Sequence, residues 1–95
     1  MKAILWDGRN KFYGYLIFTL RRLQFRLQDF EATELFFDLE YTAINDFNYY
    51  HLYGLDVAGI VIQSSAHKKN IFLVDEPTHL FEELMKRVQL VHHNN

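Results

Sequence analysis

The sequence predicts a single domain of mainly β structure, in which seven short strands are followed by one C-terminal helix. Three observations support this prediction. Apolar residues recur at every second position through most of the chain, which is the period of a strand with one buried face. The period changes to that of an amphipathic helix only in the last segment. The 95 residues include four glycines and one proline, so short turns must join the elements.

The first three strands are predicted from one apolar run and two alternating segments. Residues 3–6 form a short apolar run, and the turn-forming residues 7–10 end it. Residues 12–19 alternate between two faces and are rich in aromatic and β-branched side chains, which strands favour. Residues 22–28 alternate more regularly, with apolar side chains inward and polar ones outward. This last pattern is typical of an antiparallel strand with one exposed face.

Four more strands are predicted after a polar connection. Residues 35–41 again alternate between two faces. Residues 44–53 are rich in aromatic side chains but less regular, and we expect this strand to end at Gly54. Residues 57–64 and 70–74 are the last two strands, with a polar turn between them.

The C-terminal helix is predicted from apolar side chains at helical spacing. These are Leu80, Phe81, Leu84, Val88 and Val91. Asp75, Glu76 and Pro77 precede this stripe, where acidic residues and proline suit the start of a helix. We expect one domain over residues 1–91 and a frayed tail over residues 92–95.

Composition excludes several classes of protein. The chain has no cysteine, which excludes disulfides, thiolate zinc sites, iron–sulfur clusters and cysteine nucleophiles. A net charge of −2 argues against nucleic acid as a partner. No apolar run approaches the roughly 20 residues of a membrane-spanning helix. We therefore expect a cytoplasmic domain, with peripheral attachment to a membrane as the alternative.

No pattern in the chain indicates catalysis. The five histidines lie at spacings that do not suit a metal site, and we interpret them as surface or packing residues. There is no nucleophile elbow and no glycine-rich phosphate loop. We predict a non-catalytic binding or adaptor module, with no catalytic residue, metal or cofactor.

The central hairpin resembles GRAM domains, a branch of the pleckstrin-homology-like superfamily. The family pattern G-x-L-x-x-T-x-x-R-L-x-F is matched by Gly14, Leu16, Thr19, Arg22, Leu23 and Phe25. Residues 37–39 with Ile44, residues 59–62 and 69–72, and the helix from Pro77 resemble later parts of the family, although extra residues precede Ile44. The resemblance implies a partly open seven-stranded antiparallel barrel, capped by the C-terminal helix. Gly14 would then allow close strand crossing, and Thr19 would bond within the hairpin turn.

The resemblance also places a basic cluster at one end of the barrel. Its loops one–two, three–four and six–seven gather there, and relatives often bind phosphoinositides with them. In this chain the candidates for anion or lipid binding are Arg9, Lys11, Lys68 and Lys69. The loop between the third and fourth strands brings Asp29, Glu31 and Glu34 to the same end. A solvated rim of mixed charge is therefore the alternative.

The outward face of the second and third strands is the main candidate for a protein contact. Tyr13, Tyr15 and Ile17 are too apolar for a face in water, and they would stand beside Arg22. Self-association is the simplest form of such a contact, and stacking of single-stranded nucleic acid is a further alternative. The arginines themselves have a structural explanation, because Asp38 and Glu40 would pair with Arg22 and Arg26 across strands.

The aromatic stretch over residues 47–53 supplies two further candidates for a protein contact, Tyr49 and Tyr50. Core packing would explain about half of these aromatic side chains. The others could line a groove beside an edge strand.

Overall fold

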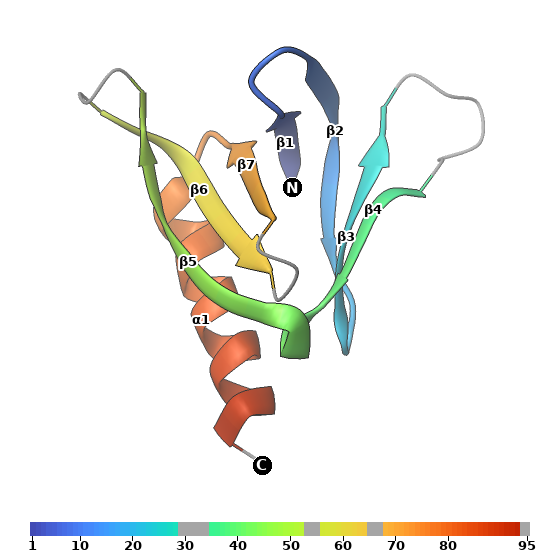
Figure 1. The fold of residues 1–95 in the computed structure, drawn as a ribbon, viewed down its shortest axis with the longest axis vertical. Helices are drawn as coiled ribbons and strands as arrows, with labels where there is room; N and C mark the ends of the chain where they lie inside the picture. Colours follow the sequence, from blue (N-terminus) through green and yellow to red (C-terminus); the bar gives the residue numbers. More distant parts are fainter. Residues whose placement is uncertain (29–34, 53–55, 65–67, 94–95) are drawn as a thin grey trace.

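A computed structural model describes residues 1–28, 35–52, 56–64 and 68–93. These residues form one antiparallel sheet of seven strands and one C-terminal helix (Figure 1). The strands are β1 (Lys2–Trp6), β2 (Lys11–Phe18), β3 (Arg22–Leu27), β4 (Leu35–Glu40), β5 (Ile44–His51), β6 (Val57–Ser64) and β7 (Lys69–Leu73), and the helix is α1 (Pro77–His93). The mainly β fold class predicted from the sequence is confirmed.

The strand limits lie within two residues of the predicted ones, and two other features differ from the prediction. A 3-10 turn, η1 (Tyr41–Ala43), separates β4 from β5, and the alternation of apolar residues did not reveal it. The helix continues to His93, so the predicted tail is wrong for residues 92 and 93. Neither glycine nor proline follows Val91 in the sequence, so no helix-breaking residue stops the helix there.

The strand order is β4-β3-β2-β1-β7-β6-β5. Neighbours in the chain pair with each other except β4 and β5, and the first strand pairs with the last through Ile4–Leu73 and Trp6–Ile71. The two edges of the sheet therefore belong to consecutive strands. Figure 1 shows the sheet bent into two halves, with β1 and β7 at the centre and α1 alongside β5 and β6.

The core lies between the two halves of the sheet and the helix. Phe72 on β7 is fully buried, and its ring contacts Phe25 on β3 at 5.9 Å and Phe37 on β4 at 5.3 Å between centroids. These contacts join strands that are separated in the order of the sheet. Leu80 and Leu84 of α1 are also fully buried. The alternating apolar positions and the helical stripe thus meet in one core.

Two glycines allow the strands to approach closely where the sheet bends. A Cβ atom at Gly14 in β2 would overlap the Arg26 carbonyl on β3, and one at Gly59 in β6 would overlap the Phe72 carbonyl on β7. The close crossing expected at Gly14 is therefore confirmed. Any side chain at these positions would push the paired strands apart.

Candidate functional site

The outer side of β2 carries Tyr13, Tyr15 and Ile17, as the alternation predicted. Their exposed fractions are 54%, 36% and 37%. The strand is central in its half of the sheet, with β1 on one side and β3 on the other. Exposed apolar side chains that are scattered singly are ordinary, whereas a contiguous row marks a surface that another molecule can cover.

The strands β1 and β7 extend this row. Ile4 lies opposite Tyr13 and Leu73, and Trp6 lies opposite Ile71. Residues directly opposite each other in a ladder share a face of the sheet. These β1 and β7 side chains are half-buried and lie outside the buried core. The outer aromatic face, as it is called below, consists of Ile4, Trp6, Tyr13, Tyr15, Ile17, Ile71 and Leu73.

The two candidate tyrosines of β5 lie on opposite sides of the sheet. Tyr50 contacts Trp6 edge to face, with 5.8 Å between ring centroids. Tyr49 stacks on Phe81 of α1, with 4.5 Å between centroids and 12° between planes, and Phe47 also packs against Phe81. Tyr50 therefore adjoins the outer aromatic face, whereas Tyr49 has a packing role and is removed from the candidate surface.

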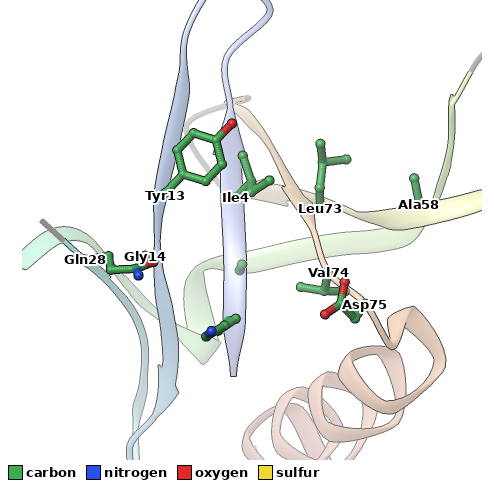
Figure 2. Close-up of a pocket in the computed structure, with 10 residues that line it drawn as sticks. Ile4, Tyr13, Gly14, Gln28, Ala58, Leu73, Val74 and Asp75 are labelled. Atoms are coloured by element: carbon green, nitrogen blue, oxygen red, sulfur yellow. The ribbon is translucent and has the colours of Figure 1, made fainter.

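A hollow of about 250 Å³ lies between β2 and the end of β7 (Figure 2). Tyr13 and Gln28 stand at one end, Ile4 and Leu73 at the middle, and Asp75 at the other end. The remaining lining residues are Lys2, Ala3, Gly14, Ala58 and Val74. A second hollow, lined by Met1, Lys2, Asp75 and Glu76, continues from the first. Small side chains and a glycine leave this space, and polar groups surround an apolar floor, as in many ligand sites.

Arg22 is held by two carboxylates of β4. Its Nη1 donates to Asp38 at 2.8 Å and its Nη2 donates to Glu40 at 2.9 Å. The structural explanation of Arg22 is thus confirmed, and this guanidinium is already neutralised. The same pairing expected for Arg26 is wrong, because Asp38 lies opposite Gln24 and Glu40 opposite Arg22, whereas Arg26 lies opposite Leu35.

The first hairpin turn has a well-defined geometry. Oδ1 of Asp7 accepts the backbone N–H groups of Arg9 at 2.9 Å and Asn10 at 2.6 Å, and Gly8 adopts a φ of 95°. These backbone hydrogen bonds lower the pKa of the Asp7 carboxyl below its ordinary value. These hydrogen bonds therefore fix the backbone of the turn that carries Arg9 and leads into Lys11.

The four basic loop residues come from two neighbouring segments. Trp6 pairs with both Lys11 on β2 and Ile71 on β7, so the start of β7 lies beside the first hairpin. Arg9, Lys11, Lys68 and Lys69 are all exposed. The predicted acidic neighbours Asp29, Glu31 and Glu34 fall outside the described residues, as does His67.

A group of hydrogen bonds connects the β2–β3 turn to the helix. Thr19 Oγ1 bonds with the backbone of Arg22 at 3.0 Å, which confirms its expected role in the turn. The Thr19 carbonyl accepts the hydroxyl of Tyr41 at 2.7 Å and Nη1 of Arg87 at 3.2 Å. The Arg87 guanidinium also lies 5.0 Å from the centroid of the Phe18 ring. These contacts fix the C-terminal end of β2, which carries the exposed Ile17.

No group of three or more metal-ligating side chains occurs within residues 1–28, 35–52, 56–64 and 68–93. In the same part of the chain, no helix is both long and apolar enough to cross a membrane.

Comparison with known proteins gives a structural relative. No family model matches the sequence, and no curated protein matches it. Among solved structures, the chain is similar to the C-terminal domain of an unknown protein from Leishmania infantum. The TM-score is 0.78 at 18% sequence identity, and the match covers 92% of this chain and 78% of that domain. At this identity the likeness concerns the fold alone.

The sequence did not reveal how far the candidate surface extends. Ile4, Trp6, Ile71 and Leu73 were recognised only as strand residues. Their common surface depends on the pairing of β1 with β7, which are the first and last strands. The signal available in the sequence was weak: β1 and β7 are apolar on both faces, which is unusual for strands with one solvated side.

Proposed function

We propose that this domain is a non-catalytic interaction module that binds a protein partner through the outer aromatic face. The observation that carries the proposal is the exposure of Tyr13, Tyr15 and Ile17 in one row, with Tyr13 beside a hollow. Aromatic side chains and arginine are enriched at protein interfaces, and aromatic anchors that fill pockets contribute most of the binding energy.

Several features support a module of the GRAM type within the pleckstrin-homology-like superfamily. The strand order leaves the sheet open between β4 and β5, and the helix packs against β5, β6 and η1. Gly14 and Thr19 have the structural roles that the family pattern implies. The absence of cysteine from the sequence is consistent with the cytoplasmic location that we propose for it.

The proposal is tested by photo-crosslinking in the cell from which the protein comes. A benzoylphenylalanine placed at Tyr15 should form a covalent adduct with a protein, since this position would lie inside the interface. The same residue at His79, which is exposed on α1, is the matched control. Equal labelling from both positions, or no protein adduct from Tyr15, would contradict the proposal.

A second candidate function is peripheral membrane binding through the basic loop residues. The pairing of Trp6 with Lys11 and Ile71 supports it, because this pairing brings two basic segments together. Co-sedimentation with anionic, phosphoinositide-doped and neutral vesicles, at low and moderate salt, tests it. The membrane function predicts salt-sensitive binding to the charged vesicles and its loss in the double variant Lys68→Glu, Lys69→Glu. Attachment that survives this double change would reject it.

A further inference from the structure

The centre of the outer aromatic face is a grid of three rows across β2, β1 and β7. The rows are Lys11 with Trp6 and Ile71, Tyr13 with Ile4 and Leu73, and Tyr15 with Lys2 and Asp75. The ladder pairs of β1 fix every member except Asp75, which follows Leu73 by two positions and lines the hollow together with Lys2. Figure 2 shows Ile4 at the middle of this grid, between Tyr13 and Leu73. The grid therefore has an apolar centre, and its charged side chains lie at the margins.

Opposite charges occupy two diagonally opposite corners of the grid. Lys11 lies at the β2 corner beside the first hairpin turn, and Asp75, followed by Glu76, lies at the β7 corner before α1. Lys2 lines the hollow beside Asp75, but no ion pair among the described residues joins the two side chains. Two residues along a strand span about 7 Å and neighbouring strands lie about 4.8 Å apart, so the two corners are about 17 Å apart, too far for Lys11 to pair with Asp75 of its own chain. A covering molecule binds both corners best if it carries a carboxylate at one end and a basic group at the other.

A second copy of this chain meets that condition when a twofold axis runs diagonally over the grid, from Tyr15 through Ile4 to Ile71. This axis exchanges the two charged corners, so Lys11 of each copy lies opposite Asp75 of the other. The unequal spacings of the grid leave an offset of about 3 Å between these two positions, which a lysine side chain can span. Because the axis is diagonal, the strands of the two sheets cross at roughly a right angle, which is one of the two ordinary ways in which sheets pack.

The other positions of the grid are also compatible with this axis. The residues on the axis meet their own copies, so apolar and aromatic side chains pack against each other. Trp6 lies opposite Leu73 of the other copy. Lys2 lies opposite Tyr13, whose ring face attracts a cation. Within the grid, the arrangement therefore opposes no two like charges.

We propose that the partner is a second copy of this chain, bound through the grid with the two sheets nearly at right angles and with two ion pairs between Lys11 and Asp75. This inference rests on the proposed function and names its partner. The grid is much smaller than the 20–30 residues that each side contributes to a standard interface, so the dimer is weak and reversible, with a dissociation constant on the order of 0.1 mM.

Sedimentation velocity of the whole chain over a series of concentrations tests the proposal. The average mass of the wild type should rise from one chain toward two. Lys11→Glu and Asp75→Lys should each weaken self-association about tenfold or more, because either change opposes like charges at both contacts. Lys68→Glu is the matched control. It makes the same change of charge as Lys11→Glu outside the grid and should alter the dissociation constant less than about twofold.

An equimolar mixture of the Lys11→Glu and Asp75→Lys proteins gives the decisive measurement. The mixture should associate again, because one contact of the mixed dimer joins the two original groups and the other joins the two introduced groups, each with opposite charges. Amide NMR spectra of each variant check that the fold persists. A mixture that associates no more than either variant alone would overturn the pairing of Lys11 with Asp75.

Failure of this inference can be distinguished from failure of the proposed function. A wild type that stays monomeric up to about 1 mM, or variants that associate as the wild type does, would overturn the second copy. Tyr15 lies on the proposed axis, so the benzoylphenylalanine at this position should give an adduct with the mass of two chains. An adduct with a different protein alone would overturn the second copy but keep the outer aromatic face as an interaction surface. If Tyr15 gives no protein adduct, the proposed function fails as well.

Discussion

At the scale of single residues, Tyr41 shows how one side chain connects three elements. It is 1% exposed, and its hydroxyl reaches the Thr19 carbonyl in the β2–β3 turn. Arg87 of α1 donates to the same carbonyl. Burial raises the pKa of the Tyr41 phenol, and the charge of Arg87 opposes part of this rise. The sequence included Tyr41 in the alternating strand over residues 35–41, but its hydrogen bond depends on a turn 22 positions earlier.

We expect Tyr41→Phe to lower the free energy of unfolding by about 1 kcal/mol, because one hydrogen bond is lost while the ring remains packed. Since the pKa of the native phenol lies above its unfolded value, Tyr41 contributes stability below the unfolded pKa that is lost as pH rises through the native one. The difference in the free energy of unfolding between the wild type and Tyr41→Phe should therefore become smaller at alkaline pH. Urea titrations at neutral and alkaline pH measure both effects, and an identical midpoint at neutral pH would contradict the first.

Residue pairing could be predicted only where the strands stay in register. Arg22 pairs with the two carboxylates expected for it, at the start of β3. Arg26 lies beyond the bulge that follows Phe25 and is opposite Leu35, whereas Asp38 and Glu40 lie opposite Gln24 and Arg22. A bulge inserts one residue into one strand without a clear sequence signal, so cross-strand pairs beyond it could not be predicted. The two neighbouring tyrosines of β5 show the same limit, because the irregular pattern of that strand left their faces open.

At the scale of elements, the close approach of β2 to β3 and of β6 to β7 depends on glycine. Gly14 and Gly59 occupy corresponding positions in the two halves of the sheet, each against the carbonyl of a paired strand. Element types could be predicted well from the period of the apolar residues. Element ends could not, because η1 and the last helical turn carry no distinctive residues.

Gly14→Ala should cost about 3 kcal/mol or more, since the added methyl group would overlap backbone rather than a movable side chain. Gly8→Ala is the matched control. Its Cβ would meet no atom within 4 Å, and the change should cost only the strain of a positive φ, about 1–2 kcal/mol. Thermal unfolding of both variants gives the comparison. A Gly14→Ala protein as stable as Gly8→Ala would show that the strands can separate at little cost.

At the scale of the whole molecule, α1 completes the core that the open sheet leaves uncovered. Its buried side chains Leu80, Leu84 and Val88 face β5, β6 and η1. The helix stripe predicted these positions correctly. The hollow, in contrast, could not be predicted, because it forms between strands that are adjacent only in the folded sheet. Its walls come from β1 and β2, from Gln28 after β3, from Ala58 on β6, from Leu73 on β7 and from the segment before α1.

Leu84→Ala should lower the free energy of unfolding by about 2–5 kcal/mol, because a fully buried side chain leaves a cavity. That is a large share of the roughly 5–15 kcal/mol typical of a domain. Met85→Ala removes a neighbouring side chain that is 39% exposed, and it should cost less than about 1 kcal/mol. Chemical denaturation with far-UV circular dichroism measures both. Similar losses in the two variants would mean that α1 contributes little packing.

The pairing of β1 with β7 has a consequence for the way the chain folds. Ile4 and Leu73 meet directly although about 70 residues separate them, so the centre of the sheet closes only after β7 has been synthesised. Each half consists of hairpins with local contacts, which form quickly, whereas the long-range closure carries a large entropic cost. Until then β1 exposes an apolar strand on its β7 side. A nascent chain is therefore most open to aggregation along β1, one of the three strands that later carry the outer aromatic face.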